Sequence, residues 1–159
     1  MPRPAVFSAE DFWQFSLSHY ARAGVEQACL TLQNTYQGNV NLALLLHWLD
    51  TLHIELADQQ IHALTASLVA SDKQLHQYRT MRQQLKPQLD QAGYQQLLTF
   101  ELELEKSQQH ALIEQLNRSL PSSVPITETG TKTITPTNLT RYFRQLGATS
   151  ILPHLQNLS

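Results

Sequence analysis

The chain has 159 residues, a formal net charge of −2 and 42% apolar residues. This is the size of one ordinary domain with a single hydrophobic core. The sequence holds 27 leucines and 19 glutamines but only 5 glycines and 7 prolines. Such a composition favours helices and argues against the collagen-like, disulfide-rich and all-β classes. We therefore expect an all-α fold, a single compact bundle of about five to seven helices.

Other sequence features bear on location and charge. No apolar run approaches the ~18 residues of a membrane span, and the N-terminus lacks the charged and apolar regions of a signal peptide. The single cysteine, Cys29, cannot form an internal disulfide, so we expect a cytoplasmic protein. Residues 1–71 carry two bases against six acids, and residues 72–159 carry nine bases against seven acids. We interpret these biases as solvated surfaces of opposite sign.

The first predicted helix begins after Ser8, which is expected to be its N-cap because Glu10 and Asp11 follow in the first turn. Gly24 is expected to end it. Its apolar arc spans roughly 200°, wider than the stripe of about 100° that a surface helix needs. This helix therefore packs on two sides, or packs on one side and presents aromatic residues on the other. The arc contains Phe12, Trp13, Phe15, Ser16, Leu17, His19 and Tyr20.

Two further helices are predicted over residues 25–36 and from Asn39 to about Leu52. Either Asn39 or Asn41 can cap the second of them. The second of these is apolar nearly all round, which is typical of a central helix surrounded by others. A buried strand over residues 42–46 is the competing interpretation. Helix is favoured because the apolar character continues to Leu52 and the run lacks valine and isoleucine.

The middle of the chain predicts a helical hairpin over residues 72–120. Asp58 is expected to cap a helix, and Ser71, three residues before Gln74, resembles a capping box for the next one. The pattern does not decide whether these two helices are continuous. Pro87 stops or kinks the chain. A long helix is predicted after Gly93, over residues 94–120.

The C-terminal part of the chain differs in composition from the helical part before it. Residues 121–136 hold three prolines, one glycine and many threonines, which predicts a flexible linker. Thr137 can cap a short helix over residues 138–146 that Gly147 closes. The tail over residues 151–158 either folds back or frays. We therefore expect a helical domain over residues 1–120, the linker, and a short helix and tail over residues 137–159.

Residues that could carry chemistry do not assemble into a known catalytic pattern. Di-metal bundles use Glu-x-x-His on two helices, and the nearest pattern here, Asp50-x-x-His53, is expected at a helix end as a surface or capping pair. Cys29 has apolar neighbours and no histidine soon after it, so an inert core thiol is expected. Phosphate-loop, Gly-x-Ser-x-Gly and zinc-type cysteine motifs are missing. We expect no enzyme activity, no metal and no cofactor.

Two charged clusters fall on the predicted hairpin. The acidic run Glu101, Glu103 and Glu105 alternates with leucines and predicts a solvated edge. A basic stripe lies on the helix before it, without aromatic residues on which bases could stack. Nucleic-acid binding through residues 73–86 would show a steep salt dependence. The stripe consists of Lys73, Arg79, Arg82 and Lys86.

Large aromatic residues exceed what a minimal helical core requires. Either all of them belong to the core, or some line a groove between the first and third helices that accepts an apolar segment of a partner. Tyr142 and Phe143 could also cover such a groove from within the chain. The candidate walls of the groove are Phe12, Trp13, Tyr20, Leu45 and Trp48.

Three runs carry a family resemblance: FWxFSLxxY over residues 12–20, GVxxACLxLQ over residues 24–33 and NVNLxLLLxWL over residues 39–49. They resemble a small proteobacterial domain family of unknown function, over about the first third of the chain. One family member belongs to an operon for growth in the cold, whose J-domain cochaperone works with Hsp70. The resemblance implies an all-helical protein that captures a short C-terminal extension of the cochaperone and links it to other products of the operon. It supplies no catalytic residues.

We therefore expect a cytoplasmic adaptor that binds the C-terminal peptide of a J-domain cochaperone and binds neither nucleic acid nor membrane. The alternative is a small hydrophobic-ligand-binding protein or enzyme that holds a lipid or isoprenoid in the same cavity. That alternative predicts polar groups converging inside the cavity, such as His47 or His19.

Overall fold

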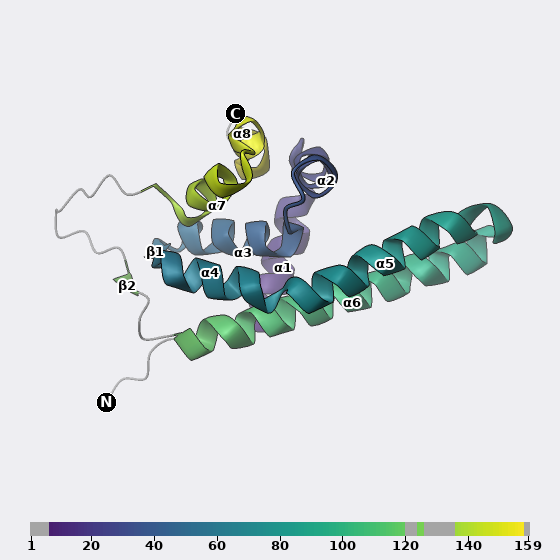
Figure 1. Cartoon of the computed structure of the whole chain (residues 1–159), viewed down its shortest axis with the longest axis horizontal. Coiled ribbons are helices and arrows are strands. Elements are labelled where there is room, and N and C mark those ends of the chain that lie inside the picture. Colours follow the sequence, from purple (N-terminus) through teal and green to yellow (C-terminus); the bar gives the residue numbers. More distant parts are fainter. Residues whose placement is uncertain (1–6, 120–123, 126–135, 158–159) are drawn as a thin grey trace.

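The structure, a computed structural model, describes residues 7–119, 124–125 and 136–157. These residues form eight α-helices, two short 3-10 helices and one pair of two-residue strands (Figure 1). The all-α prediction is confirmed, but there are eight helices, not five to seven, because the tail folds into a helix of its own. In chain order the elements are α1 Ala9–Tyr20, α2 Val25–Thr35, α3 Val40–Thr51, β1 Ile54–Glu55, α4 Asp58–Ser67, α5 Val69–Leu85, η1 Lys86–Gln88, α6 Gln91–Ser119, β2 Val124–Pro125, α7 Asn138–Leu146, η2 Thr149–Ile151 and α8 Leu152–Gln156.

Side-chain caps fix the starts of three helices where the sequence predicts them. Ser8 Oγ, Asn39 Oδ1 and Thr137 Oγ1 each accept a hydrogen bond from the backbone N–H three residues later, at 3.2, 2.7 and 3.2 Å. Each of these bonds satisfies an N–H group that the first helical turn leaves free. The bounds of α7 agree with the prediction, and Gly147 ends this helix in the left-handed conformation with φ +71°.

Some predicted helix boundaries are wrong by a few residues. α5 begins at Val69, so Ser71 is not an N-cap but lies inside the helix, where its Oγ donates to the Leu68 carbonyl at 3.2 Å. α4 and α5 are separate helices, interrupted at Leu68. α6 begins before Gly93, whose N–H donates to Asp90 Oδ1 at 2.7 Å. Asp58 is the first residue of α4 and not its cap.

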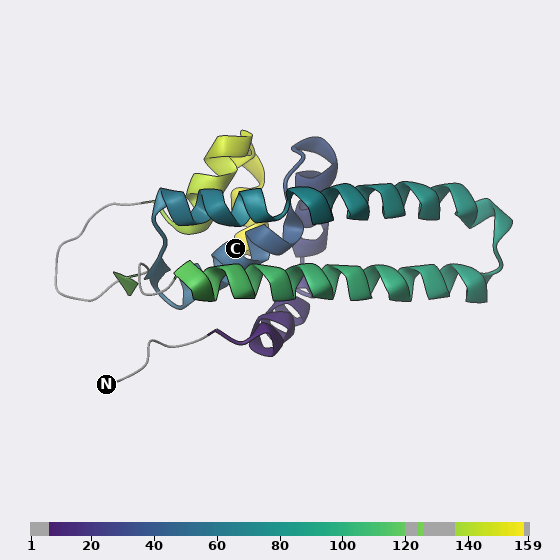
Figure 2. The same cartoon turned by 60° about the horizontal axis from the view of Figure 1, so that its bottom comes forward.

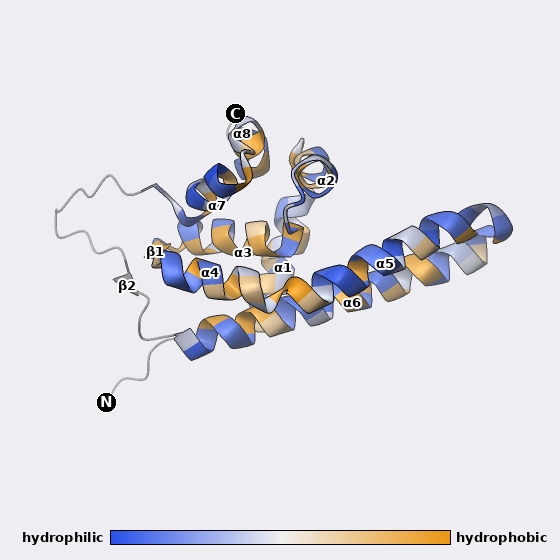
Figure 3. Cartoon of the chain, viewed as in Figure 1, coloured by the Kyte–Doolittle hydropathy of each residue, from blue (hydrophilic) through white to orange (hydrophobic). Residues whose placement is uncertain are grey.

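The hydrophobic core is centred on α3. This helix packs against α1, α2, α6 and α7, so its apolar residues meet a neighbour on every side. The prediction of a helix over residues 42–46, in place of a strand, is confirmed. Apolar residues gather on α3 and on the junction of α4 and α5 (Figure 3). The fully buried residues of α3 are Leu42, Ala43, Leu45, Leu46 and Leu49.

The C-terminal helices belong to the same core. α7 packs on α3 and α8 packs on α2, with Leu139, Phe143 and Leu155 fully buried. The Tyr142 hydroxyl accepts the backbone N–H of Asn39 at 2.9 Å and so ties α7 to the start of α3. The predicted linker over residues 121–136 lies mostly outside the described residues. Its described strand β2 pairs antiparallel with β1.

α5 and α6 form the predicted antiparallel hairpin, and its distal end extends beyond the other helices (Figures 1 and 2). We call residues 76–107 the arm and the other described residues the body. None of the arm residues is buried, whereas Leu75 and Gln108 at its base are. No helix in the described part of the chain is long and apolar enough to cross a bilayer.

Candidate functional site

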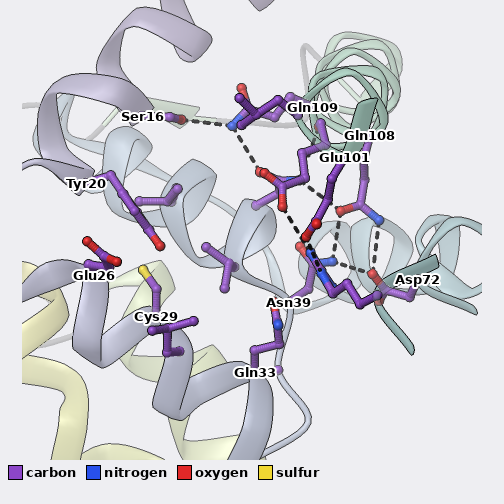
Figure 4. Close-up of a pocket in the computed structure, with 18 of the residues that line it drawn as sticks. Ser16, Tyr20, Glu26, Cys29, Gln33, Asn39, Asp72, Glu101, Gln108 and Gln109 are labelled. Atoms are coloured by element: carbon purple, nitrogen blue, oxygen red, sulfur yellow. Dashed lines mark hydrogen bonds and ion pairs between the residues drawn. The ribbon is translucent and has the colours of Figure 1, made fainter. Parts of the chain in front are cut away.

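A groove of about 890 Å³ separates the hairpin from the first two helices (Figure 4). One wall comes from α1 and α2, the other from α5 and α6, and the start of α3 closes one end. A concave site of this size is in the range of known ligand and peptide sites. We call it the hairpin groove.

The α1 and α2 wall of the hairpin groove is largely apolar. Trp13, Leu17 and Tyr20 share one face of α1 because they are spaced by three and four residues. Leu30 extends this wall along α2, and Leu102 faces it from α6. Leu17, Leu30 and Leu102 are 49%, 39% and 50% exposed. Three large apolar side chains are therefore exposed to solvent inside one groove. Single exposed leucines scattered over a surface are common, whereas a cluster of them indicates a binding site.

The hairpin wall of the groove is charged, and its two arginines are paired with glutamates. Arg79 Nε and Nη2 lie 3.1 Å from carboxylate oxygens of Glu101 and Glu105, and Arg82 Nε lies 2.6 Å from Glu101. The expectation of a solvated edge is wrong for Glu101 and Glu105, whereas Glu103 is exposed. Burial raises the pKa of Glu105, against the opposing effect of Arg79. Because its arginines are already neutralised, this wall offers little free charge to a polyanion.

A polar network joins the hairpin to the body at the closed end of the groove (Figure 4). Gln108 Oε1 accepts hydrogen bonds from the side-chain amides of Asn39 and Asn41 at 3.1 and 2.9 Å. Its Nε2 donates to Ser71 Oγ at 2.7 Å and to Asp72 Oδ1 at 3.0 Å. One buried amide thus connects the start of α3 to α5 and α6 at the closed end of the groove.

Two groups in the groove with nucleophilic atoms keep their protons at neutral pH. Burial, followed by the nearby Glu26, raises the pKa of the Cys29 thiol to about 12. Burial likewise raises the pKa of Tyr20 to about 12, with Cys29 and Glu26 adding to the shift. A thiol must ionise to act as a nucleophile. Over residues 7–119, 124–125 and 136–157, no group of three histidine, cysteine or acidic residues could hold a metal ion.

The five residues predicted as groove walls separate in the structure. Trp13 and Tyr20 line the hairpin groove. Phe12 and Leu45 are fully buried in the core, so neither presents a surface to a partner. Trp48 stacks on Phe12 at 5.5 Å between ring centroids and does not line the groove. Side chains therefore fill the space between α1 and α3, and the groove opens on the adjacent face of α1.

The prediction missed Leu17, Leu30 and Leu102. The wide apolar arc of the first helix was the available signal for Leu17, because one part of the arc packs inward and the other faces the groove. Nothing in the pattern of a single helix places Leu30 opposite Leu102, since that pairing depends on how the hairpin sits against α2. Tyr142 and Phe143 pack in the core and do not line the groove.

The two histidines considered for a polar interior lie outside the hairpin groove. The rings of His19 and His47 are 4.6 Å apart between centroids. His19 Nε2 lies 2.6 Å from the carbonyl oxygen of Leu155, which joins α1 to α8. Burial, followed by the nearby His19 and Arg22, lowers the pKa of His47 to about 4. His19 therefore ties α1 to α8, and neither histidine lines the groove.

Residues 11–112 match the model of a family described as a protein of unknown function, DUF2390. The chain belongs to the DUF2390 family. The three sequence runs that carry the resemblance lie inside this range, and so does every residue that lines the hairpin groove, from Trp13 to Gln109. The range ends before α7. None of the curated proteins or solved structures matches the chain.

Proposed function

We propose that this DUF2390 protein is an adaptor that binds a short apolar C-terminal segment of a J-domain cochaperone in the hairpin groove. The adaptor carries out no chemistry of its own and supports an Hsp70 system in the cytoplasm during growth at low temperature. The observation that carries the proposal is the convergence of Leu17, Leu30 and Leu102, all exposed, on one groove.

The choice of partner depends on the family resemblance. The three N-terminal runs resemble AtcC, the member of the family from a cold-growth operon that also encodes a J-domain cochaperone. All three runs fall on α1, α2 and α3, the helices that build one wall and the closed end of the groove. The part of the chain that resembles AtcC therefore supplies one of the two walls that a bound segment would contact, and the hairpin supplies the other.

The groove suits a short peptide with a few large apolar side chains. Burying such a side chain contributes roughly 1.5–3 kcal/mol before the cost of ordering the peptide. Two or three of them are compatible with a dissociation constant on the order of micromolar. The paired charges on α5 and α6 give the peptide a polar rim without demanding a particular net charge.

Calorimetric titration with the C-terminal peptide of the cochaperone tests the proposal. Leu30→Glu puts a charge in the apolar wall and is expected to weaken binding about tenfold or more. Leu52→Glu is the matched control, because Leu52 is 45% exposed but does not line the groove. We expect Leu52→Glu to bind as the unchanged protein does. Absence of binding by the unchanged protein at high micromolar peptide, or equal effects of the two variants, overturns the proposal.

Native mass spectrometry of the freshly purified protein tests the small-ligand alternative. An adaptor is expected to appear at the mass of the chain alone. A co-purifying lipid or isoprenoid that Leu30→Glu removes and Leu52→Glu retains would replace the adaptor with a carrier of small molecules. Binding of the cochaperone peptide by protein free of such a ligand supports the adaptor.

A further inference from the structure

The two ends of the hairpin groove differ in charge, and the difference runs along α2. Glu26 lies in the first turn of α2 and Gln33 near its end, roughly 10 Å further along the helix axis. Leu30, in the apolar wall, lies between them. Figure 4 shows Gln33 beside Asn39, where the start of α3 closes the groove, and Glu26 away from them. We call the part of the groove at Glu26 the acidic end.

The acidic end carries a negative charge that no base neutralises. Glu26 is exposed, and it forms no ion pair with any residue in the described part of the chain. Its charge acts on the groups around it: burial raises the pKa of Tyr20 and of Cys29, and Glu26 adds to both shifts. An anionic group of a bound partner is therefore disfavoured at this end.

The closed end of the groove holds a lysine. Lys73 lines the groove from α5 and is exposed. The acid next to it, Asp72, is held by neutral amides: its Oδ1 accepts hydrogen bonds from Asn39 Nδ2 at 2.5 Å and from Gln108 Nε2 at 3.0 Å. The two arginines further along α5 are paired with glutamates. Of the lysine and arginine side chains that line the groove in the described part of the chain, Lys73 alone is left to bind an anion.

Two amide side chains add hydrogen-bond donors at the closed end. Gln33 and Gln37 line the groove near the end of α2, and each carries an NH₂ group that can donate to a carboxylate. Asp72 offsets the charge of Lys73, so the closed end is close to neutral, whereas the acidic end keeps a full negative charge. A carboxylate is therefore favoured at the closed end, where a cation and amide donors are available to it.

We propose that the hairpin groove binds the cochaperone segment in one direction, with its terminal carboxylate at the closed end against Lys73. The inference rests on the proposed adaptor function. Recognition of a C-terminal carboxylate is a recurring way of binding the end of a chain. The last apolar side chains of the segment then contact Leu17, Leu30 and Leu102, and the preceding chain leaves the groove past Glu26. An extended peptide advances about 3.3 Å per residue, so about three residues span the distance between the two ends.

Calorimetric titration with the C-terminal peptide of the cochaperone, as the free acid and as the C-terminal amide, tests the direction. The amide removes the terminal charge and leaves every side chain in place. The unchanged protein is expected to bind the free acid about three- to fivefold more tightly, the range of an ion pair at an exposed lysine. Equal affinity for the two peptides overturns this inference and leaves the adaptor function standing. Absence of binding by both peptides overturns the adaptor function and this inference with it.

Lys73→Met tests whether this lysine is the group that meets the carboxylate. The variant removes the charge and keeps an unbranched side chain, and it is expected to bind the free acid and the amide within about twofold of each other. Lys86→Met is the matched control, because Lys86 is exposed on the same hairpin but does not line the groove. It is expected to keep the preference of the unchanged protein for the free acid. A preference that Lys73→Met retains, or that both variants lose equally, overturns the assignment.

A lengthened peptide separates a positioned carboxylate from a general attraction between charges. Two glycines added to the C-terminus keep the terminal charge but carry it beyond Lys73, towards the start of α3 that closes the groove. The unchanged protein is expected to bind this peptide no more tightly than it binds the amide. Binding as tight as that of the original free acid shows that the terminus does not lie at the closed end, and it overturns the proposed direction.

Discussion

The body and the arm of this protein are stabilised in different ways. The body has a continuous core of fully buried leucine, phenylalanine and other apolar residues contributed by α1–α4, the C-terminal half of α6, α7 and α8. The arm is stabilised by contacts along a single seam between two helices. These include a hydrogen bond from the Tyr78 hydroxyl to the Leu97 carbonyl and one from Arg82 Nη1 to the Tyr94 hydroxyl at 2.7 Å.

This difference indicates where stability and binding are located. Hydrophobic burial is the main favourable term in folding, so most of the free energy of unfolding comes from the body. Segments with few buried contacts open at lower cost, and binding surfaces are drawn from such segments. The hairpin groove, the proposed binding surface, takes one of its two walls from the arm.

The largest effect is expected from a core residue of the C-terminal helix. Phe143→Ala is expected to lower the free energy of unfolding by about 3–5 kcal/mol, because it removes a fully buried ring from between α7 and α3. Phe100→Ala, in the arm, is expected to change it by about 0.5 kcal/mol or less, because that ring is 55% exposed. Urea unfolding at low protein concentration measures both. Similar losses in the two variants would contradict the contrast between body and arm.

An intermediate effect is expected where the arm joins the body. Gln108→Leu removes a hydrogen-bond partner of four side chains, of which Asn41 is buried and the other three are half-buried, at a cost of about 2–3 kcal/mol. Gln96→Leu is the control on the same helix, because Gln96 is exposed. Hydrogen exchange is expected to rise in α5 at the hairpin base in Gln108→Leu and to stay unchanged in Gln96→Leu. Unchanged exchange in both variants would show that the network does not hold the hairpin in place.

More of the fold than of the site could be predicted from the sequence. Helical periodicity and caps at Ser8, Asn39 and Thr137 predicted the helices, because these signals are local in sequence. The hairpin also followed from sequence, since Pro87 interrupts two long helical patterns. The start of α5 was missed because Ser71 has the local chemistry of a cap, while the packing of Leu68 and Leu75 in the structure extends the helix past it.

The site could be predicted only in part because it depends on how the helices pack together. Trp13 and Tyr20 were predicted to line a groove between the first and third helices; they line a different groove, between α1 and the hairpin. Phe12 and Leu45 share the same apolar character, and only the position of α3 decides that they are buried. The pairing of Arg79 with Glu101 and Glu105 depends on the register between two helices. The sequence pattern of either helix alone does not determine that register.

The smallest effect is expected from a titration in the body. Burial lowers the pKa of His47 to about 4 from an ordinary 6.5, so the folded state resists protonation that the unfolded state accepts. The corresponding stability is present above pH 6.5 and is lost as the pH falls towards 4. The two pKa values imply roughly 3 kcal/mol, and about 1–2 kcal/mol is expected because water screens the half-buried ring. His47→Phe is expected to lose less stability over this range than the unchanged protein. His76→Phe, on the exposed surface of the arm, is expected to keep the original slope of unfolding free energy against pH. Equal slopes for the unchanged protein and His47→Phe would show that acid destabilisation has its source elsewhere than in this histidine.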